Sequence, residues 1–276
     1  MKTKSIQLFS ADLDGTLLGI KSSTERFVTV WNRLDPTRRP WLVYNTGRRI
    51  DDVQNLVARG VLPVADVIIG GVGTELHVAA NPQLADEFRS RFGKNWDLAK
   101  VERIVAEHPN VTRQPPEFLH PYKSSWIWPR AAPSARLELQ KKLRTAGISA
   151  VIVYSSDRFL DVLPECGNKG QALHWLCQRL GIPFERVLVA GDTGNDSSMF
   201  RLEGVHRVLV GNALPELLAD CLGYPKYEAR RIMADGVLEG LLHFGVIEQI
   251  PVEPKTDESD RPFFLNYRTK EEPIEP

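Results

Sequence analysis

Two carboxylates at alternate positions near the start of the chain could carry out nucleophilic and acid–base chemistry. Asp12 and Asp14 come directly after the apolar run 6–11 and before a glycine and a threonine. Side chains at positions i and i+2 of an extended chain share one side, and open α/β sheets bind ligands at the carboxyl ends of their strands. One carboxylate can therefore attack while the other transfers a proton. A calcium loop is excluded, because its twelfth position needs a Glu and holds Ser23.

A second acidic segment follows the apolar run 187–190 and contains Asp192, Asn195 and Asp196. If the two runs are strands of one parallel sheet, four aspartates share one crevice. They would repel one another strongly unless a divalent cation neutralised them. Oxygen ligands without a nearby His or Cys favour Mg²⁺ over Zn²⁺. We therefore expect magnesium as the cofactor.

Two further segments are suited to binding a phosphate. Lys169 opens a predicted helix, where its ammonium and the N-terminal amides can bind an oxyanion. Thr46 and Gly47 follow another predicted strand and offer a hydroxyl and a backbone amide. The next two residues, Arg48 and Arg49, are expected to form a solvated face rather than an anion site.

The sequence around these residues predicts the elements that must position them. Short apolar runs alternate with amphipathic stretches, a pattern typical of βαβ units around a mostly parallel sheet. The expected strands are 6–11, 41–44, 67–69, 186–190 and 205–210, and the expected helices are 24–34, 49–59, 170–180, 197–202, 214–221 and 234–244. The predicted fold class is α/β, with a Rossmann-like parallel-sheet core.

Residues 81–164 interrupt this pattern. The expected elements here are helices at 96–108 and 134–146 and short strands at 123–128, 150–154 and 158–163. They indicate an inserted α+β domain. The core then comprises residues 1–80 and 165–248. Residues 249–276 are charged and rich in proline, so we expect a tail that does not pack alone.

The composition excludes several classes of function. The 276 residues include 35 Lys and Arg and 35 Asp and Glu, so the formal net charge is zero. Nucleic-acid binding needs a surplus of basic residues, so we expect no nucleic-acid partner. No apolar run approaches the ~20 residues of a membrane span, and no signal segment is evident, so we expect no membrane partner and a cytoplasmic protein. P-loop and dinucleotide-binding motifs are missing.

Four segments, each at a strand-to-helix junction, together resemble the motifs of the haloacid dehalogenase superfamily of phosphotransferases. The matching residues are Asp12, Asp14, Thr46, Lys169, Asp192 and Asp196. The resemblance spans residues 5–247, and the insert lies between the second and third motifs, as does the type C2 cap of the Cof-like branch. It implies that residues 81–164 are a cap that closes over the substrate and selects it.

Within the superfamily, the chain resembles sucrose-phosphate phosphatases and mannosylfructose-phosphate phosphatases. The segments that carry this resemblance are 45–48, 70–75, 123–126, 154–157, 161–164 and 211–216. Phe159 stands where sucrose-phosphate phosphatases tend to have an acidic residue, and segments 70–75 and 211–216 are closer to the mannosylfructose-phosphate enzymes. The implied substrate is a fructosyl disaccharide phosphate, with mannosylfructose 6-phosphate modestly preferred over sucrose 6-phosphate.

The resemblance also implies a mechanism for hydrolysing a phosphate monoester. Asp12 attacks phosphorus and forms an aspartyl-phosphate, while Asp14 protonates the leaving oxygen and then activates water. The implied Mg²⁺ ligands are Asp12, the backbone carbonyl of Asp14, and Asp192, with Asp196 behind them. The implied phosphate ligands are Thr46, Gly47, Lys169 and Asn195. The candidate sugar contacts are Glu75, Lys123, Ser125, Asp157 and Asp161.

Two other functions stay open. The chain could be a non-catalytic sugar-phosphate sensor or a partner of a glycosyl-phosphate synthase, since relatives of this fold occur fused to such synthases. The presence of all the acidic and basic motif residues disfavours that hypothesis. The chain could also be a phosphomutase on the same scaffold, which would transfer the phosphate to a second hydroxyl instead of releasing it.

Overall fold

The computed structural model describes residues 5–93 and 95–250 of the chain. A central sheet has the strand order β11-β10-β9-β1-β2-β3-β4, and all neighbours are parallel except β3 and β4. Its strands are β1 (Leu8–Ala11), β2 (Trp41–Asn45), β3 (Val67–Gly70), β4 (Glu75–Val78), β9 (Val187–Gly191), β10 (His206–Leu209) and β11 (Tyr227–Glu228). The predicted α/β class with a mostly parallel core sheet is confirmed.

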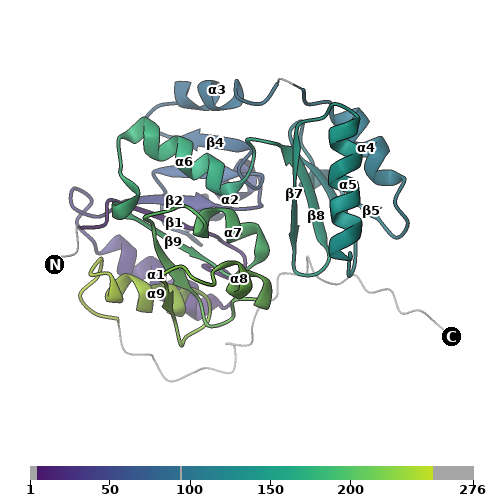
Figure 1. Ribbon diagram of the computed structural model, residues 1–276. Helices are drawn as coiled ribbons and strands as arrows, with labels where there is room; N and C mark the ends of the chain where they lie inside the picture. The colour runs from purple at the N-terminus through teal and green to yellow at the C-terminus, as the bar shows by residue number, and fades with distance from the viewer. Residues whose placement is uncertain (1–4, 94, 251–276) are drawn as a thin grey trace.

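Helices cover both faces of this sheet (Figure 1). One face packs against α1 (Lys21–Asn32), α2 (Ile50–Ala58) and α9 (Met233–His243), and the other against α3 (Gln83–Arg89), α6 (Lys169–Leu180), α7 (Ser197–Phe200) and α8 (Pro215–Asp220). In β1, Phe9 packs with the first group of helices and Leu8 with the second. Burial on both faces explains why the core strands are continuous apolar runs in the sequence.

A second, antiparallel sheet forms the inserted domain, in the order β5-β6-β8-β7. Its elements are β5 (Thr112–Arg113), β6 (Ser124–Ile127), β7 (Ala150–Ser155), β8 (Phe159–Pro164), α4 (Leu98–Ala106) and α5 (Pro133–Thr145). Trp126 and Leu160 of the sheet pack with Val101 of α4 and Leu139 of α5. The helices thus cover one face of this sheet, and the other face turns toward the core (Figure 1).

The boundary expected at residue 81 differs from the structure, because α3 packs on the core. Phe88 in α3 and Phe92 beyond it belong to the same apolar cluster as Leu173 of α6. With seven residues, α3 is too short to show a clear helical period in the sequence, and this helix was not predicted. We propose that the cap comprises residues 95–164.

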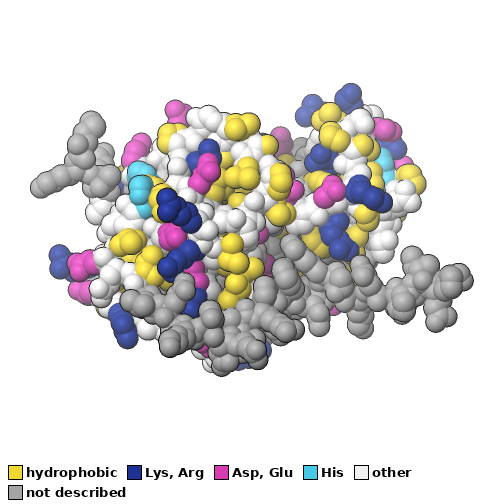
Figure 2. Space-filling model, turned by 90° about the horizontal axis from the view of Figure 1, so that it is seen from below, with side chains coloured by type: hydrophobic (Ala, Val, Ile, Leu, Met, Phe, Trp, Pro, Cys, Tyr) yellow, Lys and Arg dark blue, Asp and Glu magenta, His cyan; other side chains and the backbone are white. Residues whose placement is uncertain are grey.

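The surface carries both signs of charge. On the face shown in Figure 2, Lys and Arg side chains of the core lie among Asp and Glu side chains. None of the helices in the described part of the chain is both long and apolar enough to cross a bilayer. The cytoplasmic location and the absence of a nucleic-acid partner stay predictions. Most of the expected tail, residues 251–276, lies outside the described residues.

Phe88→Ala should lower the free energy of unfolding by about 3–5 kcal/mol, because it leaves a cavity in the core. Phe88 is 1% exposed, and its ring centroid lies 5.2 Å from those of Phe92 and Trp175. The control is Leu137→Ala on α5, at a residue that is 63% exposed. It should change stability by less than about 0.5 kcal/mol. Denaturant titration measures both, and equal effects would contradict the packing of α3 on the core.

Candidate active site

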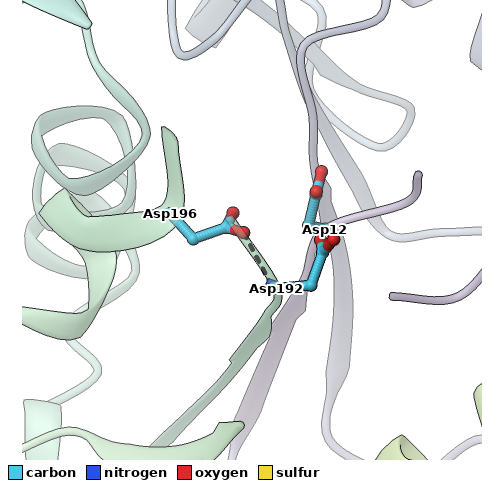
Figure 3. A group of neighbouring side chains, drawn as sticks. All are labelled: Asp12, Asp192 and Asp196. Carbon is cyan, nitrogen blue, oxygen red and sulfur yellow. Dashed lines mark hydrogen bonds between the residues drawn. The ribbon is translucent and has the colours of Figure 1, made fainter. Parts of the chain in front are cut away.

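The strand order brings the two acidic segments together. β1 and β9 are parallel neighbours, with Ala11 opposite Ala190. The pairing continues one step further, because the backbone N–H of Asp12 donates to the Ala190 carbonyl over 3.0 Å. Asp12 and Asp192 therefore leave the same edge of the sheet side by side (Figure 3). Carboxylate oxygens of Asp12, Asp192 and Asp196 lie within 4.8 Å of one another, and all three residues are buried.

A fully buried lysine joins this cluster, as the sequence predicted. Lys169 is the first residue of α6, which begins there because Asn168 caps the helix by accepting the N–H of Gln171. The Lys169 Nζ lies 2.7 Å from Oδ1 of Asp12 and 2.7 Å from Oδ1 of Asp196. Burial alone would lower the pKa of Lys169, but the two carboxylates raise it above its ordinary value. The ammonium therefore stays charged.

Both oxygens of Asp196 are engaged by the protein. Oδ1 accepts from Lys169, and Oδ2 accepts from the backbone N–H groups of Asp192 and Thr193 over 2.9 and 3.1 Å. These hydrogen bonds fix the loop that follows β9. Asp196 therefore orients Asp192 and Lys169, and its expected place behind the metal ligands stays a prediction.

The cluster has a surplus of negative charge, because three carboxylates face one ammonium. Burial raises the pKa of Asp12 to about 7, although Lys169 lowers it in part. Burial, followed by the charges of Asp12 and Asp196, raises the pKa of Asp192 well above its ordinary value. A divalent cation would remove this repulsion, and a donor set of oxygens alone is what Mg²⁺ prefers. The residues present therefore fit the magnesium ion expected from the sequence.

The glycine after Asp14 is required by the close approach of the two acidic segments. Gly15 has a φ of +84°, and a Cβ at this position would lie 2.2 Å from Oδ2 of Asp192. Only glycine allows this turn at so short a distance. The next residue, Thr16, donates from Oγ1 to Oδ1 of Asp192 over 3.0 Å. Each acidic segment therefore holds the other in place.

The expected phosphate ligands lie on segments that contact Lys169 or its partners. Asn45, the last residue of β2, donates from Nδ2 to the Lys169 carbonyl over 3.0 Å, which brings Thr46 and Gly47 to the start of α6. Thr46 is fully buried. The buried Oδ1 of Asn195 has no hydrogen-bond partner in the part of the chain that the structure describes. An amide oxygen accepts hydrogen bonds or binds a cation, so the Asn195 NH₂ group, and not this oxygen, would donate to a phosphoryl oxygen.

Arg48 belongs to the site, so its expected role as a solvated face was wrong. Its side chain is 9% exposed and donates through Nε and Nη2 to both oxygens of Asp14, each over 2.7 Å. Its Nη1 also donates to Asp52 of α2 over 2.5 Å. A bidentate pair of this kind orients the Asp14 carboxylate. Arg49, with a side chain that is 39% exposed, fits the expectation.

Three of the expected sugar contacts form one buried polar cluster in the cap. Ser125 of β6 is opposite Asp161 of β8, and its Oγ donates to Asp161 Oδ1 over 2.5 Å. The Nζ of Lys123 lies 3.7 Å from the same oxygen. It also reaches the core, where the Gly47 carbonyl accepts from it over 3.5 Å. The cluster therefore meets the core at a predicted phosphate ligand.

The other two expected sugar contacts differ in position. Glu75 accepts the backbone N–H of Ile50 over 3.3 Å. Burial raises the pKa of Glu75 above its ordinary value, and that hydrogen bond and the charge of Lys123 oppose the shift in part. It thus lies near the cap cluster. Asp157 is exposed at the β7–β8 turn, where the Tyr154 hydroxyl donates to it over 3.4 Å. Its side chain stands apart from the other four.

Sequence reasoning missed residues whose partners are backbone atoms of the motifs. Asn45 binds the Lys169 carbonyl, and Asn212 donates from Nδ2 to the Gly15 carbonyl over 2.8 Å. Asn212 Oδ1 also accepts the N–H of Met233 over 2.8 Å, which ties the first acidic segment to the start of α9. Their position in the sequence could have indicated a role, since both asparagines stand at or just beyond the carboxyl end of a core strand.

Comparison with known proteins gives a consistent match. The sequence model of the sucrose-6F-phosphate phosphohydrolase family matches residues 6–245. A mannosylfructose-phosphate phosphatase from Agrobacterium fabrum is 43% identical over 246 residues, which cover 88% of this chain and 98% of that protein. Sucrose-phosphatase 1 from Nicotiana tabacum is 29% identical, and the match covers 91% of this chain and 62% of that protein. A glucosylglycerol-phosphate synthase from Pseudomonas anguilliseptica is 31% identical over 87% of this chain and 31% of the synthase.

Solved structures show the same architecture. The sucrose-phosphatase from Synechocystis sp. PCC6803, solved in complex with sucrose and phosphate, has a TM-score of 0.79 at 28% identity. The match covers 88% of this chain and 99% of that chain. A sugar phosphatase of haloacid dehalogenase subclass IIB has a TM-score of 0.56 at 19% identity and therefore shares the fold.

Removal of divalent cations should destabilise the protein, and more so at alkaline pH. The pKa of Asp12 is raised, so without a cation its contribution to stability is present at low pH and is lost as pH rises from about 4 through about 7. Bound Mg²⁺ would replace the protons. When the concentration of free Mg²⁺ is 100 times its dissociation constant, Mg²⁺ binding should raise Tm by roughly 5–10 °C at pH 8 and by less at pH 5.5.

Thermal melts in EDTA and in MgCl₂ measure this difference in Tm. Asp192→Asn is the matched variant, because it removes one of the three carboxylates of the cluster and should abolish the response. An equal response of Asp192→Asn and the natural sequence would contradict a cation site at this cluster.

Proposed function

The chain belongs to the sucrose-6F-phosphate phosphohydrolase family, and we propose that its substrate is the phosphate monoester of mannosylfructose. It is a sugar-phosphate phosphatase, as its relatives are named. The 43% identity to a mannosylfructose-phosphate phosphatase, against 29% to a plant sucrose-phosphatase, supports this choice of sugar. Phe159 supports it too, because an acidic residue is expected there for sucrose phosphate. Sucrose 6-phosphate is the second candidate.

One observation carries the proposed chemistry: the ammonium of Lys169 lies between Asp12 and Asp196, beside Asp192. In the proposed reaction, Asp12 attacks phosphorus and the P–O bond to the sugar breaks, which leaves an aspartyl-phosphate. Water then attacks this phosphorus and releases inorganic phosphate, which restores Asp12. Bound Mg²⁺ would supply positive charge to the carboxylates and to the phosphoryl group.

Asp14 is the proposed acid and base. Its side chain is half exposed two residues after Asp12, and the guanidinium of Arg48 fixes its orientation. It would give its proton to the sugar oxygen as the ester bond breaks and then take one from the attacking water. The same carboxylate can do both, because the second step reverses the proton transfer of the first.

The proposed phosphate ligands supply hydrogen bonds to the phosphoryl oxygens. A lysine ammonium has three donors. Lys169 donates one to Asp196 and pairs with Asp12 by charge, so donor capacity stays available for a phosphoryl oxygen. Thr46, the Gly47 amide and Asn195 complete the set. Phosphoryl transfer depends mainly on positioning and charge, so a rigid and buried set of donors suits it.

The cap cluster is the proposed sugar site. Lys123, Ser125 and Asp161 offer donors and acceptors to hydroxyl groups, and they face the core beside Gly47. A sugar bound there would have its phosphate directed at the core. Closure of the cap would also exclude bulk water from the reacting phosphorus.

A role with a synthase is the second candidate function, and the match to a glucosylglycerol-phosphate synthase favours it. In that case the chain would bind a glycosyl-phosphate synthase and act on its product, or sense it without hydrolysis. A phosphomutase is the third candidate function. Phosphate released in proportion to the substrate consumed would exclude both the sensor and the mutase.

Asp12→Asn should reduce phosphate release by at least ~1000-fold while the protein stays folded, because the amide is a poor nucleophile. The assay compares mannosylfructose 6-phosphate, sucrose 6-phosphate, trehalose 6-phosphate and hexose monophosphates, with and without Mg²⁺. The control is Asp51→Asn, at an exposed carboxylate on α2 whose loss should leave activity unchanged. Unchanged turnover of Asp12→Asn would contradict the assignment of Asp12 as the nucleophile. Preference for another sugar phosphate would contradict the proposed substrate.

Lys123→Met should raise KM for the disaccharide phosphate by ~10–100-fold, because it removes a charged hydrogen-bond donor from the sugar site. Hydrolysis of p-nitrophenyl phosphate, which has no sugar to bind, should change by less. The control is Glu138→Gln on α5 of the same cap, at a carboxylate whose side chain is 64% exposed. Equal losses on both substrates would show that Lys123 does not contact the sugar.

A further inference from the structure

Glu216 connects the cap to the second acidic segment through a single oxygen atom. It lies in the first turn of α8, at the end of segment 211–216. Its Oε1 accepts the backbone N–H of Ser156, in the β7–β8 turn of the cap, over 2.8 Å. The same Oε1 accepts the backbone N–H of Gly194, between Asp192 and Asn195 in the core, over 3.1 Å.

We propose that Glu216 is a positioning residue that makes the arrangement of the acidic segment depend on the seating of the cap. The proposal rests on the proposed function, because the acidic segment is taken to bind the cation and the phosphate. Glu216 touches neither of these. It acts through the backbone of Gly194 on one side and through that of Ser156 on the other.

On the core side, α8 holds the acidic segment at two points. The Leu214 N–H donates to the Asp192 carbonyl over 2.7 Å, and Glu216 binds the Gly194 N–H two residues further on. Asn195 and Asp196 lie just beyond these points, in the single turn of 3₁₀ helix Gly194–Asp196. A turn this short has little stability of its own, so its contacts with α8 add to the hydrogen bonds that Asp196 makes with the Asp192 and Thr193 amides.

On the cap side, the contact is made by the backbone of a strained turn. Ser156 and Asp157 have φ values of +54° and +51°, which non-glycine residues rarely adopt and which cost free energy. This conformation presents the Ser156 N–H to Glu216. The Tyr154 carbonyl of the same hairpin would lie 2.8 Å from a Cβ at Gly194, so only glycine lets cap and core approach this closely.

The consequence is that one carboxylate satisfies two amides from different domains. Hydrogen bonds from backbone N–H groups to a carboxylate are strong, because the acceptor is charged. When the cap moves away, the Ser156 bond breaks and Glu216 keeps only its partner in the acidic segment. With the cap seated, the Ser156 N–H holds the Glu216 carboxylate where it binds the Gly194 N–H, and this supports the turn that carries Asn195 and Asp196, which ties catalysis to a bound sugar.

The first test is independent of the substrate. Hydrogen–deuterium exchange of the full chain should show both the β7–β8 turn and residues 191–196 exchanging at least ~10-fold faster in Glu216→Ala, because both amides lose their acceptor. Glu216→Gln retains an acceptor oxygen and should exchange close to the natural rate. The control is Asp220→Ala at the end of the same helix, which pairs with Arg201. Faster exchange in only one of the two segments would overturn the coupling.

The second test is kinetic. Glu216→Ala should lower kcat for the disaccharide phosphate by ~10–100-fold with a smaller change in KM, and Glu216→Gln should restore at least a third of the activity. Combined with Lys123→Met, its effect should be less than additive, because Lys123 also joins the cap to the core, through the Gly47 carbonyl. Additive losses would show that Glu216 is merely structural. An inactive natural sequence would overturn the proposed function, while the exchange experiment would still decide the role of Glu216.

Discussion

The site depends on one buried interaction, the ammonium of Lys169 held between Asp12 and Asp196. Charges withdrawn from water are tolerated only when they are paired, and losing one partner leaves the other buried and unpaired. Lys169 is on α6, Asp12 follows β1, and Asp196 follows β9. The three segments are therefore held in one arrangement by charge as well as by packing. Even so, one ammonium does not balance three carboxylates, and the remaining charge is what makes the cluster a site for a cation.

Around this interaction, most contacts that position the site run from side chains to the backbone. Asn45 binds the Lys169 carbonyl, Asn212 binds the Gly15 carbonyl, and Asp196 binds the amides of the acidic loop. Such contacts fix the path of the chain and leave the reacting side chains available for the substrate. The cap follows the same rule, since its hairpin meets the core through the Ser156 amide.

The sequence predicted what depends on strand order, and it could not predict what depends on the exact fold of loops. Asp12, Lys169, Asp192 and Asp196 were expected together because each lies at a strand-to-helix junction, and the structure brings them together. Arg48 was misjudged because its partner Asp14 lies 34 positions away in the chain. Asp157 was grouped with the sugar contacts although the hairpin turn carries it elsewhere. The short helix α3 was missed because seven residues give no clear period.

The order of strands in the core sheet also constrains how the chain assembles during its synthesis. β1 is made first, yet its neighbour β9 begins at Val187, so one edge of the central strand stays without its partner until most of the chain has left the ribosome. The four strands of the inserted domain all lie between Thr112 and Pro164 and pair among themselves. Local pairings form faster than distant ones. The nascent chain is thus expected to fold its inserted domain before the sheet that surrounds the acidic residues is complete.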